Sequence, residues 1–182
     1  MVNQGVLNWQ QSPLYDTYEL AITTATPVKI VFFENPTGAS KGSNLTNMAD
    51  GFKLTPPEAF QVGALRFVAI GCDKADILAL MQNYAASLIV SGKKLLEAPI
   101  EYFAGGAGIP GVATTTATTS TIESWSNGAP DPRAIAAIPV QDQILIDSGE
   151  TFRVELNGAT FDTTAALFLR CYLDGRYGRS VG

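Results

Sequence analysis

The 182-residue chain contains no histidine and only two cysteines. It therefore lacks the side chain that most often acts as a general base or metal ligand near neutral pH, which excludes Ser-His and Cys-His nucleophiles. Cys72 and Cys171 are too few for a disulfide framework, and they form no CxxC pair that would indicate zinc. We expect two free thiols, no metal, no cofactor and no enzymatic activity.

Positive charge and long apolar runs are also scarce. Twelve Lys and Arg residues against 17 Asp and Glu give a net charge of −5, which argues against non-specific binding to duplex DNA. The longest strongly apolar run, residues 85–90, is far shorter than the ~20 residues of a transmembrane helix, and no signal peptide is evident. We expect a soluble protein made in the cytoplasm, with a length that suits one compact domain.

Period-two alternation of apolar and polar residues recurs along the chain, at residues 18–22, 28–32 and 152–156. This pattern predicts half-buried strands. Residues 65–70 are apolar on both faces, which favours a central strand. Cys171 falls in phase with Leu167, Leu169 and Leu173, so we interpret it as a core thiol.

Residues 87–90 and 94–102 read as a β-hairpin closed by Ser91, Gly92 and Lys93. Pro99 lies within the second run and places an edge or a bulge there, because proline cannot donate to the ladder. Turn signals about ten residues apart, with no internal repeat, predict an antiparallel sandwich or barrel.

One helix is predicted near residues 74–84. Asp73 suits its N-cap, and Asp76 suits the positive end of the helix dipole. Its apolar stripe is expected to face a sheet and comprises Ile77, Leu78, Met81, Tyr84 and Ala85.

Residues 104–133 form a long segment rich in Gly, Thr and Ala. Long segments of this kind are functional or mobile. We consider two interpretations: a surface loop, or a segment that pairs in part as a strand or lies across a neighbouring subunit. Residues 104–108 are glycine-rich but lack the Lys-Ser/Thr of a phosphate loop.

Residues 28–60 carry the most informative pattern in the chain. The apolar run VKIVFF leads into the connector ENPTGASKGSNLTNM and then into LTPPEAF. This order resembles the jelly-roll capsid proteins of tailless, internal-membrane-containing bacteriophages and their uncultured relatives. The helix led by Asp73, the hairpin SLIVSGKKLLEAPIEYF and the last strand LRCYLDG extend the resemblance.

The resemblance implies an all-β fold: a single jelly roll of eight antiparallel strands, with the short helix capping one end. It also implies a structural virion protein, a capsid subunit that self-assembles into an icosahedral shell through trimers or capsomers. Its implied partners are further copies, other virion proteins and an underlying membrane, with no sequence-specific nucleic acid. The expected location is the virion, after synthesis in the host cytoplasm.

We expect an N-terminal arm at residues 1–17, one domain at 18–175 and a C-terminal tail at 176–182. Apolar residues in the arm, strands apolar on both faces, the long loop and the basic tail are candidate contacts between subunits. The candidate residues are Trp9, Tyr15, Phe33, Val68, Ile70, Trp125, Arg176 and Arg179.

Other functions stay open. A carbohydrate-binding jelly-roll module would stack a sugar on Trp125 or Tyr102, and a minor vertex or fibre protein of the virion would share the same fold. An enzyme would need a carboxylate pair in a cleft. The pairs available, Asp147 with Glu150 and Glu97 with Glu101, fit solvated turns and strand faces. Calcium near Asp142, Asp147 and Glu150 would lack an EF-hand spacing.

Overall fold

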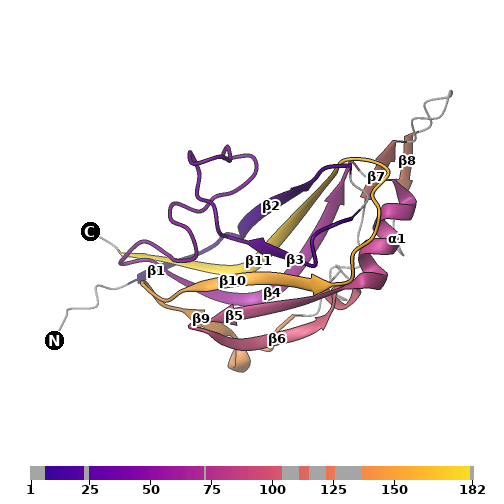
Figure 1. The fold of residues 1–182 in the computed structure, drawn as a ribbon. Coiled ribbons are helices and arrows are strands. Elements are labelled where there is room, and N and C mark those ends of the chain that lie inside the picture. The colour runs from indigo at the N-terminus through magenta and orange to yellow at the C-terminus, as the bar shows by residue number, and fades with distance from the viewer. Residues whose placement is uncertain are drawn as a thin grey trace.

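The chain folds as an all-β sandwich of two sheets (Figure 1). The computed structural model describes residues 7–22, 25–71, 73–103, 111–114, 122–125 and 137–180. In chain order the elements are β1 (Leu7–Gln11), β2 (Leu14–Leu20), β3 (Lys29–Phe32), β4 (Ala59–Ile70), α1 (Lys74–Asn83), β5 (Tyr84–Val90), β6 (Lys93–Pro99), the 3-10 turn η1 (Ile100–Phe103), β7 (Gly111–Thr114), β8 (Ile122–Trp125), η3 (Val140–Asp142), β9 (Ile144–Ile146), β10 (Phe152–Gly158) and β11 (Leu167–Ser180).

The first sheet is built around the antiparallel pair β4 and β11. Strands β2 and β1 follow each other along the outer edge of β11, and β9 and β7 lie along the outer edge of β4. The second sheet has the order β3-β10-β5-β6 and is antiparallel throughout. Strands distant in sequence are therefore neighbours in both sheets.

The core lies between the two sheets and follows the predicted alternation. Leu167, Leu169, Cys171 and Leu173 on β11 are all fully buried, which confirms Cys171 as a core thiol. Burial raises the pKa of the Cys171 thiol well above its usual range. The central position of β4 is confirmed as well, although only its inner face is fully buried.

The predicted hairpin is formed by β5 and β6. Ser91 and Gly92 connect the strands, both with positive φ (48° and 76°), as a tight two-residue turn requires. Pro99 ends β6, which is an edge strand of its sheet, so the prediction of an edge at Pro99 is confirmed.

The helix begins at Lys74, and the Asp73 carboxylate accepts a hydrogen bond from the Ala75 amide (3.2 Å). The predicted stripe is wrong at Leu78, which is 49% exposed, and at Tyr84 and Ala85, which belong to β5 and not to the helix. Leu80, which was not predicted, is fully buried, as is Ile77. The reason is that the helix packs against the end of the sandwich through one narrow stripe.

Asp76 lies in the first turn of α1, as predicted, and has a further role. Its side chain is buried and accepts hydrogen bonds from the Thr164 amide, the Thr164 hydroxyl and the Ala165 amide at 3.0–3.2 Å. The carboxylate thus ties α1 to the segment that precedes β11.

The predicted arm and tail are wrong where the structure describes them. Residues 7–11 form β1, β2 already begins at Leu14, and β11 continues to Ser180. Where β11 pairs with β4, a register shift between Asp174 and Gly175 leaves Gly63 of β4 without a partner residue, as in a β-bulge. The pairing of β1 with the end of β11 was not predicted, because both segments are rich in polar residues.

Within the predicted loop 104–133, β7 and β8 form an antiparallel hairpin, and β7 pairs in parallel with the end of β4. This agrees with the interpretation that part of the segment pairs as a strand. The remainder of the loop, like Cys72, lies outside the described residues.

Candidate assembly surfaces

The outer face of the first sheet carries a cluster of aromatic and charged side chains. Arg66 donates to both carboxylate oxygens of Asp174, and its guanidinium lies 4.7 Å from the Tyr172 ring centroid. Tyr172 in turn packs against Tyr15, with ring centroids 6.2 Å apart. Hydrogen bonding to Asp174 raises the pKa of Arg66, so its guanidinium stays protonated at physiological pH.

Two predicted contact residues lie on β4 on this same face. Val68 is half-buried and Ile70 is 40% exposed, so both are accessible to a neighbour. Phe33 is not accessible to a neighbour, because its side chain is fully buried. Its ring packs on that of Phe152, with ring centroids 5.4 Å apart. Alternation would place this side chain on the outer face. The positive φ of Phe33, 68°, turns it into the core instead. Trp125 lies in β8, and its side chain is outside the described part of the structure.

We call β1 together with residues 176–180 of β11 the terminal ribbon. It lies at the end of the sandwich opposite α1 (Figure 1). Trp9, 39% exposed, packs over Gly178, where an added Cβ would come within 3.1 Å of the indole ring. Arg176 and Arg179 are exposed on the same ribbon, so it combines an aromatic side chain with two cations, the residue types that dominate binding hot spots.

Tyr177 anchors the terminal ribbon to the body of the protein. Its hydroxyl donates to the Glu58 carboxylate, and its ring packs on Phe60 at 6.2 Å. Burial and the Glu58 carboxylate together raise the pKa of Tyr177. Arg179 lies over the same ring at 5.0 Å.

The connector that carries the sequence resemblance, residues 34–48, is fixed to β2. Asp16 is completely buried, and its carboxylate accepts hydrogen bonds from Lys41 Nζ and from the Phe33 amide, each at 2.7 Å. Asn47 accepts from the Tyr15 amide and donates to the Pro13 carbonyl, both at 2.9 Å. The Lys-Gly and Thr-Asn-Met parts of the pattern are therefore structural.

The same connector covers the outer edge of β2. Thr17 donates to the Leu45 carbonyl, Arg170 donates to the Asn44 carbonyl, and Thr46 forms a β-bridge with Asp16. Asp16 was missed as a key residue because it was expected to lie in the N-terminal arm. The available signal for a structural role of Asp16 was an acidic residue at a strand position that faces the interior of the sandwich.

On the outer face of the second sheet, Glu155 forms ion pairs with Lys29 (2.7 Å) and Arg153 (2.5 Å). Burial alone would raise the pKa of the Glu155 carboxyl, but the hydrogen bonds from Lys29 and Arg153 outweigh it and lower the pKa. The folded state therefore favours the ionised carboxylate.

We expect Glu155→Gln to remove part of the acid sensitivity of the fold. A lowered folded-state pKa contributes stability that is present above the usual carboxyl pKa and lost as pH falls through the folded value. The change should cost on the order of 1 kcal/mol or less at pH 7, since both cations are partly exposed, and nothing once the carboxyl is protonated in both states. Urea unfolding at pH 7 and pH 3 checks this; an equal loss at both pH values would contradict it.

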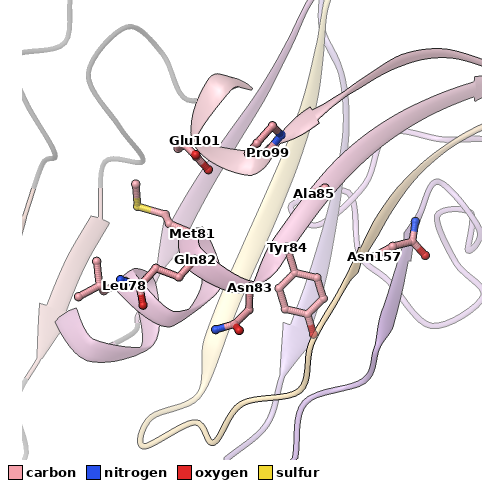
Figure 2. Close-up of a pocket in the computed structure, with 9 residues that line it drawn as sticks. All are labelled: Leu78, Met81, Gln82, Asn83, Tyr84, Ala85, Pro99, Glu101 and Asn157. Atoms are coloured by element: carbon pink, nitrogen blue, oxygen red, sulfur yellow. The ribbon is translucent and has the colours of Figure 1, made fainter.

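A shallow hollow of about 500 Å³ lies where α1 meets the second sheet (Figure 2). Its walls come from α1, β5, β6, η1 and β10, and amide groups share them with apolar side chains. The lining residues are Leu78, Met81, Gln82, Asn83, Tyr84, Ala85, Pro99, Glu101 and Asn157. The Tyr84 hydroxyl points away from the hollow and donates to the Pro27 carbonyl. Tyr102, the residue after Glu101, is 62% exposed.

Two of the carboxylates considered for catalysis, Glu150 and Glu97, have structural contacts. Glu150 accepts from the Asp147 amide and from the Ser91 hydroxyl, each at 3.0 Å, which closes the turn before β10. Glu97 pairs with Lys94 on the exposed edge strand β6. Among the described residues, no three His, Cys, Asp or Glu side chains gather as a metal site. The described helices also include none with the length and hydropathy to cross a bilayer.

Comparisons with known proteins identify no relative. No protein-family model, no curated protein and no solved structure matches the chain.

Proposed function

We propose that this chain is a structural virion protein, a single jelly-roll capsid subunit that self-assembles into an icosahedral shell. The order of its strands is the observation that carries the proposal. If β2, β3, β4, β5, β6, β9, β10 and β11 are numbered one to eight, the sheets read 1-8-3-6 and 2-7-4-5. This order supports a jelly roll, an architecture found in viral capsid and lectin domains.

The additions to this frame also suit a coat subunit. β1 extends the first sheet at one end of the sandwich, and the β7–β8 hairpin extends it at the other. Both lie outside the eight-stranded frame, where they are available to neighbouring copies. The sequence resemblance of residues 28–60 to phage capsid proteins supports the same assignment.

The mechanism is burial of surface by mass action. In a closed shell every subunit repeats the same contacts, so a weak pairwise contact gives a stable assembly when many copies share it. The outer face of the first sheet and the terminal ribbon are the candidate contacts. Further partners would be other virion proteins and an underlying membrane.

Light scattering of the purified protein over a range of concentrations tests this proposal, with negative-stain imaging of any large species. We expect masses that are multiples of the 19.3 kDa chain, as trimers, capsomers or shells. A protein that stays monomeric at every concentration, salt and pH tested would overturn the capsid assignment.

A carbohydrate-binding module is the second candidate, because Tyr102 is 62% exposed beside a hollow lined with amides and Glu101. Amide and carboxylate groups with a nearby exposed aromatic ring suit a sugar. A monomeric protein that binds glycans and loses binding in Tyr102→Ala would favour this function. A minor vertex or fibre protein would instead join particles only with a second virion protein.

A further inference from the structure

The edges of the two sheets are not equally protected against pairing with another chain. An exposed edge strand presents unpaired amides and carbonyls, and proteins block such edges with Lys, Pro or a covering loop. Strand β6 carries Lys93, Lys94 and Pro99, and the edge of β2 is covered by the connector through Thr46. Those edges are closed to a partner.

Strand β1 has none of these protections. Its sequence, LNWQQ, contains no charge and no proline. It pairs with β11 on one side, and within the described residues it has no strand on the other. We propose that this free edge pairs antiparallel with β1 of a second copy, which joins the first sheets of two subunits into one continuous sheet. The proposal rests on the proposed function, since it assigns one of the contacts of a self-assembling subunit.

The backbone register defines which groups are free. Gln11 lies opposite Arg176, and one step further the Ser12 amide donates to the Gly175 carbonyl at 3.3 Å. Backbone groups in an antiparallel ladder alternate between the two sides. The amides of Asn8 and Gln10 therefore face β11, and those of Leu7, Trp9 and Gln11 face the free edge.

These three residues are self-complementary. An antiparallel pair centred on Trp9 sets Trp9 opposite Trp9 of the second copy and Leu7 opposite its Gln11. Every free amide and carbonyl of the three residues then has a partner. The two indole rings lie on the same face as a cross-strand aromatic pair, a favourable contact in sheets.

Charge does not oppose this pairing. The exposed cations Arg176 and Arg179 lie on β11, not on β1. The β11 strands of the two copies would be three strand spacings apart, about 14 Å. That distance exceeds the screening length of ~8 Å at physiological ionic strength.

The pair is small, and its size determines how it must be tested. A five-residue edge buries much less than the ~1,600 Å² of a standard interface. The isolated dimer is therefore weak, and the contact becomes stable among the many contacts of a shell. Covalent trapping at one register detects it directly.

Cysteine trapping tests the register in a Cys72→Ser background. Asn8 would lie opposite Gln10 of the second copy in a non-hydrogen-bonded pair, with Cα atoms about 4.5 Å apart, within disulfide range. We expect an oxidised mixture of Asn8→Cys and Gln10→Cys proteins to give at least several-fold more linked dimer than either protein alone. Equal yields in all three samples, or no linked dimer, would overturn the proposal.

Gln11→Pro tests the backbone contribution. It removes an amide that faces the free edge and leaves the β1–β11 ladder intact, while Gln11→Val keeps that amide. We expect trapping to fall several-fold in the first variant and to be retained in the second, with both folded by circular dichroism. Equal trapping in the two would contradict pairing through this edge.

The outcomes separate this contact from the capsid function. Particles that form normally without β1 trapping would overturn the contact and leave the capsid proposal standing. Trapped dimers from a protein that never forms larger species would support the contact and overturn the capsid assignment.

Discussion

Replacing Asp16 with alanine is expected to lower the free energy of unfolding by about 3–5 kcal/mol, the cost of breaking a buried ion pair from one side. Asp16 is completely buried, and the side chain of its partner Lys41 is only 15% exposed. The substitution also leaves the Phe33 amide without its acceptor. Urea unfolding monitored by fluorescence measures the loss.

Glu97→Ala is the matched control. Glu97 pairs with Lys94 at 2.5 Å, but both side chains are about half exposed, so its loss should cost less than about 1 kcal/mol. A double variant, Asp16→Leu with Lys41→Met, should recover part of the stability, because a buried pair replaced by apolar groups leaves no unpaired charge. Similar losses in Asp16→Ala and Glu97→Ala would contradict this account of the connector.

The strands were predictable where one face alone is buried. Period-two alternation identified the last three residues of β2, and β3, β10 and β11, because every second side chain must enter the same core. It failed at residues 7–11 and 176–180, because LNWQQ and RYGRS contain few apolar residues. Those residues pair through their backbones, and backbone pairing leaves little trace in side-chain chemistry.

The candidate contacts were predictable only in part, because exposure depends on backbone geometry. Ile70 and Phe33 are both apolar residues at outward positions by alternation. Ile70 keeps the alternation and is 40% exposed, whereas the positive φ of Phe33 turns it into the core. The free edge of β1 could not be predicted at all, since an edge is defined by which strands do not pair.

The contacts of Asp16 also depend on the fold and could not be predicted from the sequence. Lys41 and Asp16 are 25 residues apart, and no local feature of the sequence around Asp16 indicates Lys41 as its partner. The fold of the connector brings them together. The sequence pattern of residues 34–48 therefore indicates a connector of fixed conformation. It does not indicate which residue of β2 the connector binds.

Phe67→Ala is expected to destabilise the sandwich by about 3–5 kcal/mol, the cost of losing a large buried ring and leaving a cavity. Phe67 is 1% exposed on the central strand β4. Its ring lies 5.9 Å from that of Phe32 on the facing sheet and 6.5 Å from that of Phe103 in η1. One side chain thus joins both sheets and the segment that follows β6.

Val68→Ala is the control, since the next residue of the same strand points to the outer face and is half-buried. We expect its unfolding free energy to fall by less than about 1.5 kcal/mol. The two variants also separate stability from assembly. If the outer face of the first sheet is a subunit contact, Val68→Ala weakens particle formation in a protein that remains folded. Phe67→Ala weakens assembly only through loss of the fold. Equal thermal stability of both variants would contradict the position of the core between the sheets.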